Sequence, residues 1–208
     1  MIKTVLWDFD GVILDSMKVR DWGFVKIFKD YDKELIDQLL VFHRKNGGLS
    51  RYVKIRYFFE ELLGESITEE IVQEYAAKFS VLMRKELTNP KNLILDSLKF
   101  IENNYENYNF HIVSGSDQEE LRFLCKELKI KKHFKSINGS PTQKNILVQN
   151  VINKNNYKME ETCLIGDSVN DFDAAVKNDI SFFAYNSTYL KDNSIGIYIN
   201  TLSNYKFQ

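Results

Sequence analysis

Two carboxylates lie two positions apart near the start of the chain, directly after an apolar run. The run 5–7 precedes Asp8, and Asp10 follows after one intervening residue. If residues 5–9 form a strand, side chains two positions apart point to the same side. In open α/β sheets, ligands bind beyond the carboxyl ends of the strands. The spacing therefore predicts that Asp8 and Asp10 converge at a ligand site.

A second acidic pair follows another apolar run. The run 162–165 ends at Gly166, and Asp167 and Asp171 come next. Four carboxylates gathered in a cleft of low dielectric repel one another strongly unless a cation joins them. Mg²⁺ prefers oxygen ligands and is usually shared between one or two carboxylates and a substrate phosphate. The sequence therefore predicts Mg²⁺ at a site made by Asp8, Asp10, Asp167 and Asp171.

Other polar residues are suited to holding a phosphate. Ser114 and Gly115 follow the apolar run 110–113, so a hydroxyl and backbone N–H groups at an expected helix start can bind phosphate oxygens. Lys144 stands near the start of a later helix. A carboxylate can attack phosphorus if a cation and a lysine neutralise the incoming charge, and a second carboxylate can transfer the protons. His111, inside the predicted strand, is expected to be packed rather than catalytic.

The pattern of the chain after residue 89 alternates between helix and strand. Helices are expected over residues 93–104, 118–128, 144–153 and 171–177, and strands over residues 110–114, 134–137, 162–165, 181–185 and 195–199. Such alternation predicts an α/β fold with a doubly wound parallel sheet and helices on both faces. Residues 15–88 show no convincing strand. We therefore expect an α/β core of residues 1–14 and 89–208, with an inserted helical cap of residues 15–88.

The cap is expected to contain three or four helices. Ser50 is a candidate N-cap for one of them, and Ser66 with Glu69 resembles a capping box for another, with Ile71 on its inner face. The apolar spacing of the first cap helix places four residues on its inner face: Val19, Trp22, Val25 and Ile27.

Composition excludes several classes of protein. The 208 residues include 28 basic and 29 acidic ones, and the net charge of -1 provides no field that favours nucleic acid or an anionic membrane. No apolar run approaches the roughly 18 residues of a membrane span, and no signal peptide is visible. Cys125 and Cys163 are expected to be buried, reduced thiols, which fits a cytoplasmic location. We expect a monomer or homodimer without nucleic-acid or membrane partners.

Together these motifs resemble those of the haloacid dehalogenase superfamily, specifically its aspartate-nucleophile phosphatases with a helical cap. The resemblance covers nearly the whole chain. It implies that Asp8 is the nucleophile, Asp10 the general acid and base, Ser114 the phosphate-binding hydroxyl and Lys144 the charge neutraliser. It also assigns Asp167 and Asp171 to the metal site and takes one metal ligand from the backbone carbonyl of Asp10. The segment 140–144, which reads Ser-Pro-Thr-Gln-Lys and ends at Lys144, departs from the lysine-proline pairing that is commoner in close relatives.

The turn 47–51 resembles the substrate-specificity loop of cap-bearing relatives such as β-phosphoglucomutase and phosphoglycolate phosphatase. Gly48 and Arg51 lie in this loop, and Lys54 follows Arg51 by about one helical turn. Arg51 and Lys54 are therefore expected to share a face that meets an anionic part of the substrate, whereas Arg56 points elsewhere.

The resulting hypothesis is a Mg²⁺-dependent phosphatase that acts on a small-molecule phosphate ester through an aspartyl-phosphate. One alternative is a sugar phosphomutase of the β-phosphoglucomutase kind, because residues 50–51 resemble its cap loop. Another is a non-catalytic module that keeps an acidic Mg²⁺ cleft. The presence of Asp10 favours catalysis, because binding alone does not need the second acid.

Overall fold

The computed structural model describes residues 1–207, whose strands form one parallel sheet. The strands are β1 (Thr4–Trp7), β2 (Asn109–Asp117), β3 (Ser136–Ser140), β4 (Thr162–Gly166), β5 (Ser181–Tyr185) and β6 (Ile197–Ile199). Their order is β3-β2-β1-β4-β5-β6, so β1 is central, and Val5 pairs with Phe110 on one side and Cys163 on the other. Every residue of β1 is buried, as expected for a parallel strand covered on both faces. The predicted fold class is confirmed.

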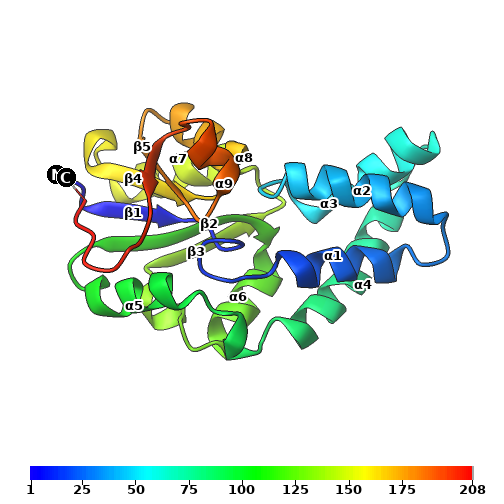
Figure 1. The fold of residues 1–208 in the computed structure, drawn as a ribbon, viewed down its shortest axis with the longest axis horizontal. Helices are drawn as coiled ribbons and strands as arrows, with labels where there is room; N and C mark the ends of the chain where they lie inside the picture. The colour runs from blue at the N-terminus through cyan, green and yellow to red at the C-terminus, as the bar shows by residue number, and fades with distance from the viewer. Residues whose placement is uncertain (208) are drawn as a thin grey trace.

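Helices cover both faces of the sheet (Figure 1). Helices α5 (Leu95–Asn104) and α6 (Gln118–Glu127) lie on one face, and α7 (Lys144–Asn155), α8 (Val169–Val176) and α9 (Thr188–Asp192) lie on the other. Short 3₁₀ turns occupy Pro90–Asn92, Lys131–His133 and Met159–Glu161. Alternation along β1 sends Val5 and Trp7 into the hydrophobic core beneath α5 and α6, and Leu6 into the core beneath α7 and α8.

Four further helices form a block beside the sheet (Figure 1). They are α1 (Met17–Ile27), α2 (Lys33–Lys45), α3 (Arg51–Tyr57), which continues into a π-helical segment (Phe58–Leu63), and α4 (Glu69–Glu86). Aromatic rings fill the centre of this block: Phe28 packs against Phe58 with ring centroids 4.0 Å apart and against Tyr75 at 5.1 Å. We call α1 to α4 the cap.

The chain enters and leaves the cap through two adjacent segments. The backbone N–H of Asp15 donates to the carbonyl of Asn92 at 2.8 Å, and that of Ile94 donates to Ile13 at 2.9 Å. Between these bonds, Leu14 and Leu93 form an antiparallel bridge. The two connections between core and cap are therefore hydrogen-bonded to each other.

Sequence periodicity misplaces the inner face of α1. Trp22 and Val25 were expected inside but are 37% and 38% exposed, whereas Arg20, Gly23 and Phe24 are buried. The reason is Arg20: a charged side chain counts as outward-facing in a periodicity argument, yet here buried acids pair with it.

The start of α4 also differs from the expectation. Thr68, not Ser66, accepts a hydrogen bond from the backbone of Ile71 as the N-cap, so Glu69 is the first helical residue and cannot complete a capping box with Ser66. Because the helix begins at Glu69, Ile71 faces partly outward and is 40% exposed.

The predicted role of Ser50 as an N-cap is confirmed, since its side chain accepts a hydrogen bond from the backbone N–H of Val53. The strand expected over 134–137 begins two residues later, because buried Phe134 follows a 3₁₀ turn instead of entering the sheet.

His111 is a packed residue, as expected. It is 1% exposed, and its ring nitrogens lie 2.7 Å from Ser136 Oγ and 3.0 Å from the Tyr157 hydroxyl. Burial, with Lys135 nearby, lowers the pKa of His111 from 6.5 to about 4. The unfolded chain therefore binds a proton between pH 6.5 and 4 that the folded protein rejects, and stability should fall as the pH falls through this interval.

This effect should amount to about 3 kcal/mol of unfolding free energy. In a His111→Gln variant, urea unfolding at pH 7 and pH 4 should show a pH-dependent loss that is smaller by about that amount. An unchanged loss would contradict the assignment of a buried, neutral imidazole.

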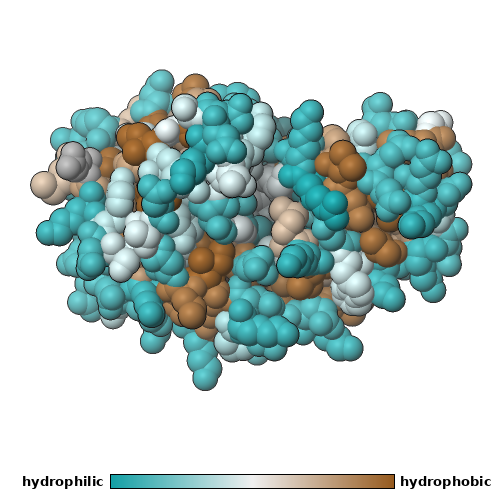
Figure 2. All heavy atoms as spheres, in the orientation of Figure 1, coloured by the Kyte–Doolittle hydropathy of each residue, from teal (hydrophilic) through white to brown (hydrophobic). Residues whose placement is uncertain are grey.

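On the face shown in Figure 2, hydrophilic side chains predominate and hydrophobic areas are scattered among them. Cys125 and Cys163 are buried free thiols, as expected. Among residues 1–207, no helix combines the length and apolar character that crossing a bilayer requires.

Candidate active site

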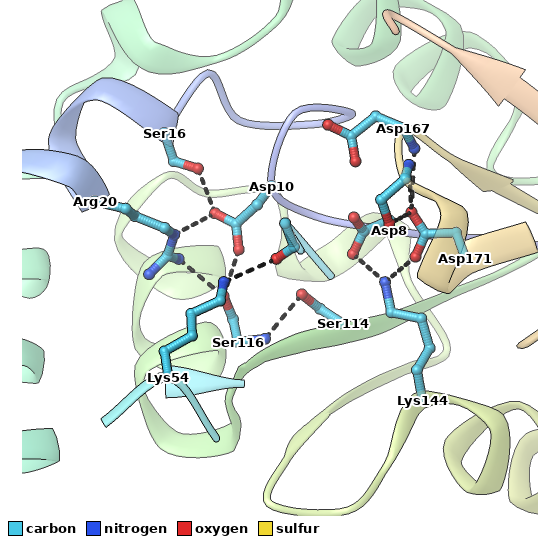
Figure 3. A network of polar contacts seen from close by, with 12 residues as sticks. Asp8, Asp10, Ser16, Arg20, Lys54, Ser114, Ser116, Lys144, Asp167 and Asp171 are labelled. Carbon is cyan, nitrogen blue, oxygen red and sulfur yellow. Dashed lines mark hydrogen bonds and ion pairs between the residues drawn. The ribbon is translucent and has the colours of Figure 1, made fainter. Parts of the chain in front are cut away.

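Three carboxylates meet at the carboxyl ends of β1 and β4. Asp8 follows β1, with its backbone N–H bonded to Ile165 of β4 at 2.9 Å; Asp167 follows β4, and Asp171 lies in the first turn of α8. Asp8, Asp167 and Asp171 each offer an oxygen within 4.8 Å of the others. Figure 3 shows them gathered on one side of Ser114. The structure thus brings together three of the four acids predicted at this site, from runs about 160 residues apart, whereas the Asp10 carboxylate lies outside the cluster.

Lys144 is the cation that the structure places among these acids. It is the first residue of α7 and is 8% exposed, and its amine donates to Asp8 at 2.8 Å and also to Asp171. Although burial alone would lower the pKa of Lys144, Asp171 and Asp8 raise it above its ordinary value. Lys135, the preceding lysine in the chain, is exposed and bonded to Asn109 instead.

One lysine does not neutralise this cluster. Burial and then the charge of Asp171 raise the pKa of Asp8 to about 7, although Lys144 acts in the opposite direction. Burial and the charges of Asp8 and Asp171 raise the pKa of Asp167 well above its ordinary value. Buried carboxylates that repel one another and present only oxygen ligands fit a hard divalent cation. The residues present therefore fit a divalent metal ion.

The loop after β1 makes room for Asp167. Gly11 has a φ of +79°, and a Cβ at this position would lie 2.0 Å from the Asp167 carboxylate. Any other residue at position 11 would displace Asp167 or strain the backbone. The glycine that follows Asp8 and Asp10 thus allows the two acidic motifs to approach each other.

Ser114 and Asp8 line the same cavity, but Ser114 has a different place in the secondary structure from the one that the sequence predicted. Strand β2 does not end at residue 114; it continues to Asp117 through a shift of register against β3, and α6 begins only at Gln118. Ser114 and Gly115 therefore lie within β2, before its last residues, and not at a helix start. The Ser114 hydroxyl accepts a hydrogen bond from the backbone of Ser116 at 3.1 Å.

Asp10 has separate partners from the cluster of Asp8, Asp167 and Asp171 (Figure 3). One carboxylate oxygen accepts from Ser16 and, at 2.7 Å, from Nε of Arg20, and the other accepts from Ser116. Burial alone would raise the pKa of Asp10, but Arg20 and the hydrogen bonds from Ser116, Ser16 and Arg20 outweigh burial and lower that pKa. Asp10 is therefore held as a carboxylate in this arrangement.

A buried glutamate of the core joins two arginines of the cap. Glu120, on α6, is fully buried; one carboxylate oxygen lies 3.2 Å from Nη1 of Arg20 on α1, and the other lies 2.7 Å from Nη2 of Arg51 on α3. Nη1 of Arg51 also donates to Ser80 at 2.5 Å. We call Arg20, Glu120 and Arg51 the Glu120 network.

Sequence reasoning missed four residues of the site: Ser16, Arg20, Ser116 and Glu120. A signal existed for the first two, because Ser16 and Arg20 are four residues apart and would face the same way at the start of a helix. A signal also existed for Ser116, because it directly follows Ser114 and Gly115, the candidates for binding phosphate. For Glu120 the sequence carried no signal.

The cap and core together line a cavity that opens to solvent. From the core it is lined by Asp8, Asp10, Ser114, Gly115 and Ser116, and from the cap mainly by Arg20, His43, Gly48, Arg51 and Lys54. The backbones meet closely at its edge, where a Cβ on Gly115 would lie 2.2 Å from the carbonyl oxygen of Gly48. All the predicted substrate-binding residues therefore line the same cavity as the predicted nucleophile.

Residues 5–185 match the family model described as haloacid dehalogenase-like hydrolase. The chain belongs to this family. Among solved structures, a predicted phosphatase from Clostridium acetobutylicum is 15% identical, with a TM-score of 0.76 over 98% of this chain and 96% of that one. No curated protein sequence matches the chain.

Two further structures share the fold of this haloacid dehalogenase-like hydrolase. β-Phosphoglucomutase from Clostridium difficile is 16% identical, with a TM-score of 0.75 over 100% of this chain and 94% of that one. The HAD-hydrolase YfnB from Bacillus subtilis, in a form bound to magnesium, is 18% identical, with a TM-score of 0.70 over 97% and 96% of the two chains. At these identities the likeness establishes a common fold.

Proposed function

We propose that this hydrolase is a Mg²⁺-dependent phosphatase that cleaves a small-molecule phosphomonoester through an aspartyl-phosphate on Asp8. One observation carries the proposal: Asp8 is paired with a buried lysine in an acidic cluster, while Asp10, with different partners, lines the same cavity. A nucleophile and a separate proton-transfer group are the two carboxylates that this chemistry needs.

The first half of the reaction transfers the phosphoryl group to the protein. A carboxylate oxygen of Asp8 forms a bond to phosphorus, and the bond from phosphorus to the ester oxygen breaks. Asp10 is a carboxylate in the ligand-free arrangement, and the negative charge of a phosphate bound beside it raises its pKa, so that it takes up a proton. Asp10 then gives this proton to the departing oxygen. Lys144, which donates to Asp8, and the Ser114 hydroxyl, which lines the same cavity as Asp8, would offset the charge on the oxygens of the transferred group.

The second half returns the protein to its starting state. The carboxylate of Asp10 takes a proton from water, whose oxygen bonds to phosphorus as the bond to Asp8 breaks. Inorganic phosphate leaves, and Asp10 is again protonated. Asp8, Asp167 and Asp171 would hold Mg²⁺, which supplies positive charge for the phosphoryl oxygens when bound.

A panel of phosphomonoesters, assayed for released phosphate with Mg²⁺ or with EDTA, tests the function. We expect turnover of at least one small ester with Mg²⁺ and a loss of at least about a hundredfold with EDTA, because the acids repel one another when the cation is absent. Isomerisation of a sugar phosphate without phosphate release would instead identify a phosphomutase. No conversion of any ester, with folded protein that binds Mg²⁺, would favour a binding module.

A further inference from the structure

Lys54 is buried in the cavity without an acidic partner. Its side chain comes from α3 of the cap and is 3% exposed, and its amine donates to the carbonyl of Gly47 at 3.3 Å. Within the part of the chain that the structure describes, no carboxylate oxygen lies within 4.0 Å of this amine. In Figure 3 the amine points toward Asp10 and Ser116, on the opposite side of Ser114 from Lys144.

The other cap cations near the cavity are already paired. Arg20 contacts Asp10 and Glu120, Arg51 contacts Glu120, and Arg44 pairs with Asp21 at 2.9 Å. Of the three cap cations that line the cavity, Arg20 and Arg51 therefore have acidic partners within residues 1–207. Lys54 is the cation left over. A buried cation is costly unless an anion pairs with it, and no acid of residues 1–207 forms an ion pair with Lys54.

His43 adds a second unsatisfied polar group to the same wall. It is 1% exposed, and neither ring nitrogen makes a hydrogen bond within residues 1–207, although Nε2 lies 3.7 Å from Asp21 Oδ1. Burial and the charges of Lys54 and Arg20 lower the pKa of His43 to about 2, so the ring is neutral. A neutral imidazole beside an unpaired ammonium group is suited to a polar, anionic ligand.

We propose that Lys54 binds a second anionic group of the substrate, a carboxylate or a phosphate distinct from the phosphoryl group that Asp8 receives. The proposal rests on the proposed function and narrows its substrate class to compact phosphomonoesters that carry another negative charge. Arg51, which the sequence placed in this role, is neutralised by Glu120 and positions the cap. Burial lowers the pKa of Lys54 to about 7, as expected for an ammonium group that lacks its counterion when the ligand is absent.

Phosphonates, which cannot be hydrolysed like esters, test the subsite by binding alone. Calorimetry with Mg²⁺ would compare alkylphosphonates of two to four carbons with the phosphonocarboxylates and the diphosphonates of matched length. We expect at least one compound with a second acidic group to bind about 10- to 100-fold more tightly than its alkyl analogue, because a charge-assisted hydrogen bond contributes that much. Whether the carboxylates or the diphosphonates gain more identifies the second group.

Variants at position 54 assign the preference to its amine. Lys54→Met should bind the compounds with a second acidic group as weakly as it binds the alkylphosphonates. The affinity for the alkylphosphonates should not change. Lys54→Arg should retain part of the preference for the second acidic group. Arg56→Met is the matched control: Arg56 is on the same helix but pairs with Glu60 and Glu69 at the surface, so the preference should remain. Affinities are compared only for variants whose circular dichroism matches wild type.

The outcomes separate this proposal from the proposed function. The subsite is overturned if wild type binds every compound with a second acidic group no more tightly than its alkyl analogue, or binds neither measurably. A preference that persists in Lys54→Met overturns it as well. A preference that depends on Lys54, with no phosphate released from any ester, would support the subsite and reject the phosphatase.

Discussion

An Asp8→Asn variant should lose Mg²⁺-dependent phosphate release by at least about a thousandfold, because the amide cannot act as the nucleophile. The substitution changes little in shape. It also removes one of the mutually repelling buried charges that raise the pKa of Asp8 and Asp167. The variant should therefore remain folded, with a melting temperature in EDTA equal to or above that of wild type. Initial rates of phosphate release and thermal unfolding check the two parts.

Asp15→Asn provides a matched control for the loss of activity. Asp15 is an exposed aspartate seven residues further along the chain, and its replacement should leave the rate unchanged. If Asp8→Asn kept activity to within about tenfold of wild type, Asp8 would not be the nucleophile. Equal losses in both variants would point to damage of the fold instead of the chemistry.

Glu120→Gln should destabilise the protein by about 3 kcal/mol or more, because it leaves two buried arginines without their shared counterion. For a chain of this size, that loss corresponds to a fall in melting temperature of roughly 6–12 °C. The Glu120 carboxylate is fully buried and contacts Arg20 and Arg51, so water cannot replace the missing charge without opening the contact between cap and core. Urea and thermal unfolding of the variant measure the effect.

The neighbouring glutamate shows whether burial is the cause. Glu119 is also on α6, but its side chain is 70% exposed and pairs with Arg122 at the surface. Glu119→Gln should change the unfolding free energy by less than about 0.5 kcal/mol. Similar stability of the Glu120 and Glu119 variants would show that the Glu120 network does not hold the cap against the core.

The clustering of Asp8 and Asp167 could be predicted because both follow the strands that position them. Apolar runs ending in Asp8 and Asp167 indicate both the strand and its carboxyl end, and a parallel sheet brings such ends together. The end of β2 was misjudged because Ser114 and Gly115 favour turns, whereas pairing with β3 extends the strand to Asp117. Local preference did not determine where that strand ended.

The Glu120 network could not be predicted because its contacts join distant parts of the chain. Arg20 and Glu120 are 100 residues apart, and Glu120 stands next to another glutamate of the same charge and helix propensity. Which of the two is buried depends on how the cap sits over α6. The sequence pattern likewise identified Lys54 as a candidate for binding the substrate. It did not show that Lys54 lacks an acidic partner, since that depends on which acids Arg20 and Arg51 contact.

The paired connections between core and cap have a consequence for how such a protein can diversify. Because Asp15 bonds to Asn92 and Ile94 to Ile13, the ends of the inserted segment are already side by side in the core. Replacing the insert with a longer or shorter one adds little loop-closure entropy and leaves the sheet unchanged. The cap residues that line the cavity, such as Lys54, can therefore be exchanged as a module without altering the scaffold that holds Asp8.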